Sequence, residues 1–145
     1  MYILFEGKYL NDKKNGFGKE YIKDSSNHSG EDKIRSKLIF EGQYLNGVKN
    51  GKGREYNKEG KILFEGEYKN GNKWNGIIRN YYYDTTLIFE YKLIEGEIKG
   101  KVKEYYKNGQ FKFEGEYLDG KKWNGFIYNK DDAQKCEVKW KNNNI

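Results

Sequence analysis

The chain has 145 residues, the length of one ordinary domain, and only 35% of them are hydrophobic while 17% are aromatic. Its 28 Lys and Arg residues outnumber its 22 Asp and Glu residues, and the formal net charge of +6 fits either a lysine-rich surface or an anionic partner. The single cysteine, Cys136, excludes an internal disulfide and a cysteine-based zinc site. The first residues carry no secretory signal and no run of about 18 apolar residues could span a membrane, so we expect a cytoplasmic protein.

A short motif recurs along the chain and defines its organisation. Phe5-Glu6-Gly7-Lys8-Tyr9 returns with few changes at residues 40–44, 64–68 and 113–117, in divergent form at 89–93 and in part at 136–140. The copies are about 24 residues apart except across a longer first interval. We therefore expect one array with units near 2–22, 38–60, 61–86, 87–109 and 110–132, a terminal half unit at 133–141, and a polar loop insertion at 23–37.

Each unit carries the pattern of a β-hairpin. Residues 62, 64, 66 and 68 alternate with a more polar set, as in a strand. The dipeptides Asn46-Gly47, Asn70-Gly71 and Asp119-Gly120 predict type I′ turns, whose two central residues both need a positive φ. Tyr56 lies one position further along its strand than the repeat requires, which predicts a β-bulge or a ring on the other face. The expected fold is all-β, an elongated single-layer antiparallel sheet of tandem hairpins.

The glycines inside the strands need a reason of their own, because glycine weakens a strand. We expect Gly42, Gly66 and Gly115 to leave room for Phe and Tyr rings to lie over the backbone. The third and fifth units place a Trp beside the turn and have Ile78 or Ile127 where we align a second glycine, so the larger side chains are expected to fill that space. The residues expected to form the repeated packing are Phe5, Gly7, Tyr9, Phe40, Gly42, Tyr44, Phe64, Gly66, Tyr68, Phe113, Gly115, Tyr117, Trp74, Trp123 and Trp140.

These motifs resemble the MORN repeat (membrane occupation and recognition nexus), whose units run approximately Tyr-x-Gly-x-Trp-x-x-Gly and then Gly-x-Gly. The resemblance covers nearly the whole chain and is closest to a variant form that ends in Glu-Tyr-Tyr-x-x-Gly, as at residues 104–109. Phe stands where the common form has Tyr, Tyr stands where it has Trp except at Trp140, and Tyr91 replaces the first glycine of the fourth unit. The resemblance implies a twisted run of hairpins with rings along one face, which serves as a scaffold, a dimerisation module or a membrane-apposed tether.

Catalytic chemistry finds little support in the sequence. The only histidine, His28, lies in the insertion, far along the chain from Cys136, and the carboxylates recur with the repeat instead of converging on one site. Gly16-Phe17-Gly18 and Gly51-Lys52-Gly53 lack the helix start that a phosphate-binding loop requires. We therefore expect no enzymatic activity, no catalytic residue, no metal and no cofactor.

Charge follows the repeat, with Glu in the leading strands and Lys in the turns and return strands, so cross-strand pairs worth roughly 0.2–1 kcal/mol each are expected. Six lysines at the turn edge are candidate contacts for anionic lipid: Lys13, Lys14, Lys49, Lys73, Lys121 and Lys122. The expected function is a scaffold for a protein partner, and the alternative is a peripheral tether to anionic lipids. Packed rings would not be free to stack on single-stranded nucleic acid, so no specific nucleic acid is expected. A missing secretion signal argues against cell-wall sugars, and the terminal strands could self-associate.

Overall fold

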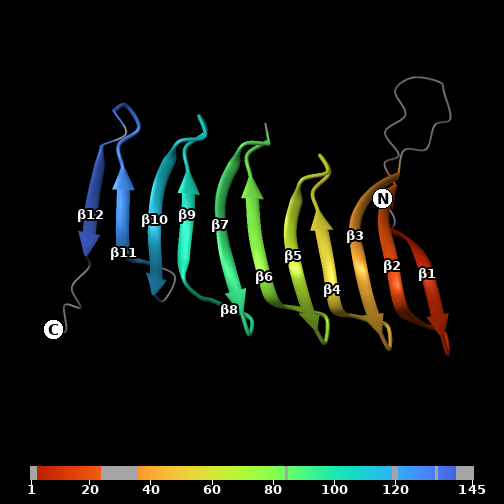
Figure 1. Cartoon of the computed structure of the whole chain (residues 1–145). Coiled ribbons are helices and arrows are strands. Elements are labelled where there is room, and N and C mark those ends of the chain that lie inside the picture. Colours follow the sequence, from red (N-terminus) through yellow and green to blue (C-terminus); the bar gives the residue numbers. More distant parts are fainter. Residues whose placement is uncertain (1–2, 24–35, 84, 119–120, 133, 140–145) are drawn as a thin grey trace, which may run out of the picture. The chain divides into compact units, whose positions relative to one another are not determined.

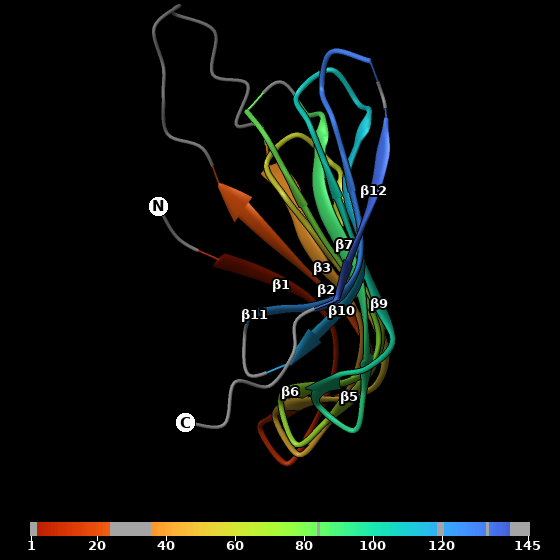
Figure 2. The same ribbon diagram turned by 90° about the vertical axis from the view of Figure 1, so that its left-hand side faces the viewer.

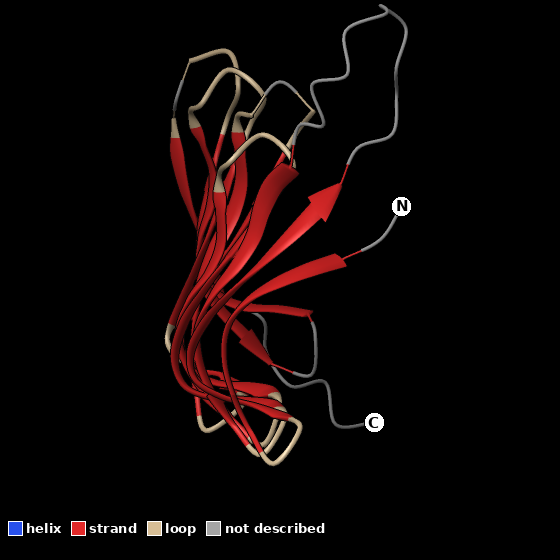
Figure 3. Ribbon diagram, turned by 90° about the vertical axis from the view of Figure 1, so that its right-hand side faces the viewer, coloured by secondary structure: helices blue, strands red, loops and turns tan. Residues whose placement is uncertain are grey.

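The computed structural model describes residues 3–23, 36–83, 85–118, 121–132 and 134–139, and these residues form twelve strands and no helix (Figures 1 and 3). Among them, accordingly, no helix is long and apolar enough to cross a membrane. The strands are β1 (Ile3–Leu10), β2 (Lys13–Lys23), β3 (Ser36–Leu45), β4 (Val48–Tyr56), β5 (Ile62–Lys69), β6 (Asn72–Tyr81), β7 (Leu87–Ile94), β8 (Glu97–Ile98), β9 (Lys101–Tyr105), β10 (Phe111–Leu118), β11 (Lys121–Tyr128) and β12 (Lys135–Lys139).

The strands pair antiparallel. The chain divides into two compact units, Met1–Trp74 and Asn75–Ile145, so that β6 begins in the first unit and continues in the second. The expected all-β antiparallel sheet of tandem hairpins is confirmed.

In the first unit, β1 to β5 lie side by side in chain order (Figure 1), and Figure 2 views these strands from the side. The predicted turns have the positive φ angles that type I′ geometry requires, 51° and 91° at Asn46-Gly47 and 50° and 85° at Asn70-Gly71. The register against β5 shifts between Glu55 and Tyr56, which confirms the expected bulge.

A row of glycines crosses the first unit, one from each strand. Each glycine pairs with the next across the sheet: Gly7, Gly18, Gly42, Gly53 and Gly66. The Phe40 ring lies over two of them, because a Cβ on Gly42 would come within 2.7 Å of the ring and a Cβ on Gly53 within 2.9 Å. Phe5 covers Gly7 and Gly18 in the same way. The glycines therefore provide space for rings that would otherwise stand away from the sheet.

The rings of the first unit form a continuous edge-on row. Phe40 packs against Tyr44 at a centroid distance of 5.5 Å and against Tyr68 at 5.4 Å, with nearly perpendicular planes. Phe5 packs against Tyr9 and Tyr44 in the same manner. Phe40 is only 1% exposed and Tyr68 4%, whereas Tyr9 on β1 is 59% exposed. This row is the core of the unit, and Tyr9 lies at its open end.

In the second unit the strand order is β6-β7-β9-β10-β11-β12, with the short β8 paired to β7. The Glu95-Gly96 turn keeps positive φ angles of 56° and 81°, so the fourth hairpin begins normally. Its return strand is then split into β8 and β9 around Gly100, whose φ is 83°. The fourth repeat is therefore the irregular one.

The fifth repeat regains the glycine pair, but not where the sequence alignment places it. Gly115 pairs with Gly125, and the Phe113 ring lies over both. Ile127 pairs with Phe113 and is 36% exposed, so the expectation that Ile127 replaces a strand glycine is wrong. The reason is that β11 reaches Gly125 one residue sooner after its turn than β4 reaches Gly53.

Some expectations fall outside the described residues. The insertion at 23–37 is described only at its two ends, where β2 ends at Lys23 and β3 begins at Ser36. His28, the Asp119-Gly120 turn and Trp140 also lie outside.

Candidate functional site

The face that carries the Phe rings also carries a row of return-strand carboxylates, since Glu20 pairs across the sheet with both Phe5 and Phe40. The Glu20 carboxylate lies 2.7 Å from Lys14 Nζ and 3.6 Å from Lys49 Nζ. Burial alone would raise the pKa of Glu20. The hydrogen bond from Lys14, the nearby Tyr44 hydroxyl, and the positive charges of Lys49 and Lys14 outweigh this effect. Together they hold the pKa of Glu20 below its usual range. Glu20 is therefore a partly buried carboxylate that is paired with the ammonium groups of Lys14 and Lys49.

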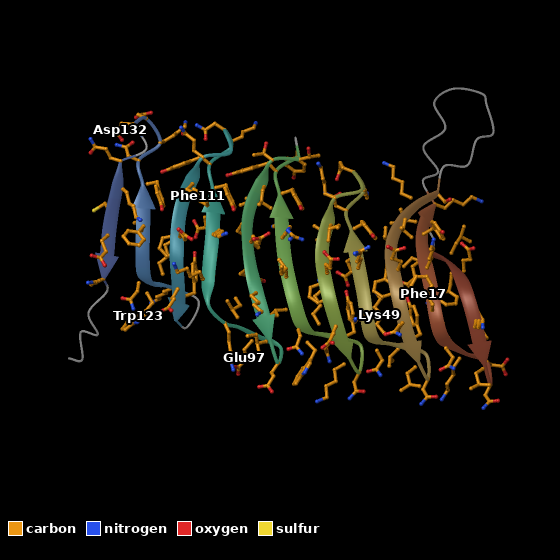
Figure 4. The ribbon with its side chains drawn as sticks, in the orientation of Figure 1. Phe17, Lys49, Glu97, Phe111, Trp123 and Asp132 are labelled. Carbon is orange, nitrogen blue, oxygen red and sulfur yellow. The ribbon has the colours of Figure 1, made fainter. Side chains whose placement is uncertain are left out.

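The same cluster recurs one repeat later. The Glu55 carboxylate lies 3.6 Å from Lys49 Nζ and 2.7 Å from Lys73 Nζ, so Lys49, labelled in Figure 4, bridges the carboxylates of Glu20 and Glu55. The Lys49 ammonium is also 3.8 Å from the centre of the Phe40 ring, a cation–π contact. Burial opposes the charge on Glu55, but its lysine and tyrosine neighbours again lower the carboxyl pKa. Charge and ring packing are thus combined in one repeated cluster.

In the second unit Glu104 makes the third cluster. It accepts a short hydrogen bond from the Tyr117 hydroxyl and one of 2.9 Å from Lys122 Nζ. The Lys122 ammonium lies 4.7 Å from the centre of the Phe113 ring, as Lys49 lies over Phe40. Burial, followed by the contact with Glu104, raises the pKa of Tyr117 well above its ordinary value.

The hydroxyls of Tyr44 and Tyr68 occupy the corresponding place in the first unit. Both are buried, and neither forms a hydrogen bond of good geometry with any described residue. Burial and then the adjacent carboxylates, Glu20 and Glu55 respectively, raise the pKa of both tyrosines far above the ordinary value. Each hydroxyl is therefore an uncharged, protonated group beside its carboxylate.

Four of the six lysines proposed as lipid contacts belong to these clusters. Lys14, Lys49, Lys73 and Lys122 each lie within 3.6 Å of a carboxylate oxygen and over a Phe ring. Lys13 and Lys121 are exposed beside the turns. The structure thus separates a set of packing lysines from lysines that remain at the turn edge, and lipid contact stays a prediction for the latter.

Sequence reasoning passed over the carboxylates of the return strands, namely Glu20, Glu55 and Glu104. The signal was present, because each of them directly precedes a Tyr in its return strand. Where the third unit meets the fourth, one cluster is replaced as a whole. Asn80 takes the Glu position, as its pairing with Phe89 shows, and the opposed pair Leu93 and Ile98 takes the positions of Tyr and Lys.

A pocket opens in the second unit beside the irregular fourth repeat. It has a volume of about 310 Å³ and is lined by residues that include Phe89, Tyr91, Ile98, Val102, Glu104 and Lys112. Because Tyr91 stands in place of a glycine, Phe89 cannot lie over the backbone, and the two rings stack instead at 5.6 Å with an interplanar angle of 25°. A second stacked pair, Tyr105 and Phe111, lies 5.1 Å apart. The pocket therefore results from the irregular repeat.

The opposite face of the first unit is polar and open. A shallow groove of about 430 Å³ there is lined by Phe17, Glu41, Arg54 and Glu65 among others. Arg54 donates two hydrogen bonds to Glu65, of 2.8 and 2.6 Å, and lies 3.9 Å from Glu41. Phe17, labelled in Figure 4, is 57% exposed and lines the same groove.

The hairpin tips of the first unit expose apolar side chains. Leu10, Leu45 and Val48 are 59%, 48% and 45% exposed. The tips stack on one another, because Gly47 N–H donates to the Lys14 carbonyl at 2.9 Å. Exposed aliphatic groups and Lys13 therefore share one border of this unit.

Within the described part of the chain, no group of three or more His, Cys, Asp or Glu side chains is arranged to hold a metal ion. Cys136 is a free, exposed thiol. The chain matches no model of a known protein family and no curated protein.

Proposed function

We propose that this chain is a non-enzymatic scaffold of MORN-type repeats that binds a protein partner. The observation that carries the proposal is the recurrence of one cluster of Lys, Glu, Tyr and Phe at Glu20, Glu55 and Glu104. A catalytic centre needs unlike groups converging on one reacting atom, whereas here the titratable groups neutralise one another repeat by repeat. The rings and charges of this face stabilise the sheet and leave the opposite face for binding.

The opposite face of the first unit suits a protein better than a polyanion. Arg54 is held between Glu41 and Glu65, so the positive charge of this region is matched locally by carboxylates. Aromatic side chains and Arg are enriched in protein interfaces, and Phe17 and Arg54 line the same groove. We therefore assign the partner to the groove beside Phe17 and Arg54.

The experiment is affinity capture from the native source on immobilised protein, with Phe17→Ala and Arg54→Ala variants. Truncating a central interface residue typically weakens binding by 2 kcal/mol or more, so both variants should lose the captured partner by roughly 30-fold or more in affinity. The matched control is Lys58→Ala, which changes an exposed residue in the turn after β4. Capture of the same partner at full strength by both face variants would contradict the assignment.

A second function, a peripheral tether to anionic lipids, is favoured by one specific observation. The tips of the first unit combine exposed Leu10, Leu45 and Val48 with the exposed Lys13. Apolar side chains that enter the interface add to an attraction of about 1 kcal/mol per lysine near an anionic surface. In this proposal the membrane contact is made by apolar and cationic side chains together, and not by lysines alone.

Flotation with vesicles of phosphatidylcholine alone, or with added phosphatidylserine, tests the tether. Leu45→Ser should reduce flotation at every salt concentration, whereas Lys13→Glu should reduce it only at low salt, because screening acts over about 8 Å at physiological ionic strength. A Lys49→Gln variant serves as a control for an ion-paired lysine on the packed face. Absence of flotation with either vesicle would leave the protein scaffold as the function.

A further inference from the structure

The pocket of the second unit is a consequence of coordinated replacements. In a regular repeat the Phe ring covers a glycine pair and the Tyr–Lys–Glu cluster closes over it, as at Phe40, which is 1% exposed. In the fourth repeat Tyr91 lifts the ring of Phe89, and Leu93 and Ile98 supply neither hydroxyl nor ammonium. A cavity of about 310 Å³ lies beside Phe89, Tyr91 and Ile98 and extends to Glu104 and Tyr117 of the next cluster.

The walls of this cavity have a definite chemistry. The rings of Phe89, Tyr91 and Tyr105 offer flat π surfaces to it; Phe89 and Tyr91 are nearly parallel, and Tyr105 is supported from outside the lining by the stacked Phe111 ring. Ile98 is 46% exposed at the cavity, whereas Val102 is 5% exposed. Flat apolar walls of this kind select a planar ligand, because offset stacking needs ring planes a few ångströms apart. The volume is at the lower end of small-molecule sites, which fits a ligand of one or two fused rings.

Charge distinguishes an anionic from a cationic ligand. Glu104 is the carboxylate of the cavity wall, and its oxygens already accept from the Tyr117 hydroxyl and from Lys122. Lys112 is 48% exposed in its side chain, and its ammonium lies 3.9 Å from Glu104, beyond hydrogen-bonding distance. The ammonium groups of Lys112 and Lys122 lie around one carboxylate, that of Glu104, whose oxygens already accept hydrogen bonds. Lys112 can therefore donate hydrogen bonds to a ligand, and the local charge is positive.

We infer that this cavity binds a small planar aromatic carboxylate, with its ring against those of Phe89, Tyr91 and Tyr105 and its carboxylate on Lys112. This goes beyond the proposed scaffold function and uses a different unit of the chain. A neutral aromatic ligand would stack but would form no ion pair with Lys112. A cationic aromatic ligand would be repelled by Lys112 and Lys122. The order of affinity is therefore acid above amide above amine.

The test is titration of the full chain with 2-naphthoate, followed by methyl NMR, with 2-naphthamide as the neutral probe. The Ile98 and Val102 methyl signals should shift saturably, since stacked rings act on nearby protons, while the Leu10 methyl signals of the first unit should not move. Ile98→Trp fills the cavity and should abolish binding of both probes. Lys112→Met should weaken 2-naphthoate by roughly two- to fivefold, as expected for a half-exposed ion pair, and leave 2-naphthamide unchanged.

Lys112→Arg should retain the difference between the two probes, and Lys130→Met, an exposed change elsewhere in this unit, should alter neither affinity. If Ile98→Trp fails to fold, the methyl map of the unaltered chain decides the location of the site. Equal binding of acid and amide, an unchanged affinity in Lys112→Met, or shifts confined to other methyl groups would each overturn the inference. Capture of a protein partner at Phe17 and Arg54 is measured separately, so failure of one proposal does not imply failure of the other.

Discussion

Replacing Gly53 with Ala tests whether the Phe40 ring needs bare backbone beneath it. Gly53 is buried and has no positive φ, so alanine brings no backbone strain of its own. A Cβ there would lie 2.9 Å from two ring carbons of Phe40 and 3.1 Å from the Tyr68 ring. Overpacking of a tightly packed core typically costs about 1–3 kcal/mol. Without the clash, Ala would stabilise the fold by about 0.4–1 kcal/mol through the unfolded chain, so the sign of the change decides the question.

Urea unfolding followed by far-ultraviolet circular dichroism measures the change, and a double-mutant cycle with Phe40→Leu locates its cause. Because a leucine leaves the space above Gly53, the two substitutions should couple favourably by about 0.5–3 kcal/mol. Gly42→Ala is the comparison, since its Cβ would lie 2.6 Å from Gly53 Cα and 2.7 Å from both the Lys52 carbonyl oxygen and the Phe40 ring. Because two of those atoms are backbone, Phe40→Leu should rescue Gly42→Ala less than it rescues Gly53→Ala. A gain in stability for Gly53→Ala, or zero coupling with Phe40→Leu, would refute the packing argument.

Two further predictions concern the ring row and its charges. Tyr68→Ala removes a ring that is 4% exposed and should lower the free energy of unfolding by about 3–5 kcal/mol. Tyr9 has the same repeat position but is 59% exposed, so Tyr9→Ala should cost about 1 kcal/mol or less. Thermal unfolding measures both, and equal losses would show that position in the row is irrelevant. Glu55→Gln tests linkage: the lowered carboxyl pKa contributes stability that is present above the unfolded value of about 4.5 and is lost as pH falls through the folded value. The stability gap between wild type and Glu55→Gln should therefore narrow on acidification, with Glu59→Gln in an exposed turn as the control, and a gap that does not change with pH would contradict this reading.

Much of the fold followed from local rules. The Asn46-Gly47 and Asn70-Gly71 dipeptides have the positive φ angles that their residue types favour, and the bulge at Tyr56 lies where the spacing predicted it. The register of the fifth repeat did not follow, because the pairing of Gly115 with Gly125 depends on the number of residues from the turn and not on the similarity of the sequences. A shift of one position on a strand changes the face that a side chain occupies, so small differences in turn length have large effects.

The clusters were harder to predict from the sequence than the fold. Composition identified lysines at the turns, but whether a lysine such as Lys49 extends to solvent or folds back over a Phe ring depends on a carboxylate from the return strand of the preceding repeat. That carboxylate is remote in sequence and becomes a neighbour only through antiparallel pairing. Pairing each leading Phe with the Glu opposite it would have found Glu20, Glu55 and Glu104.

The fourth repeat shows why an irregular copy deserves more weight than the regular ones. The Phe, Tyr, Lys and Glu of a regular repeat depend on each other: the ring needs the glycines, the lysine needs the ring and the carboxylate, and the tyrosine closes the row. Losing one alone would leave a buried polar group without its counterpart, at a penalty of about 1–3 kcal/mol. The chain instead carries Asn80, Leu93 and Ile98 together, with Tyr91 in place of the glycine. Such a joint replacement keeps the strands paired and leaves a cavity beside the replaced residues. The irregular repeat is therefore the place to search for a ligand.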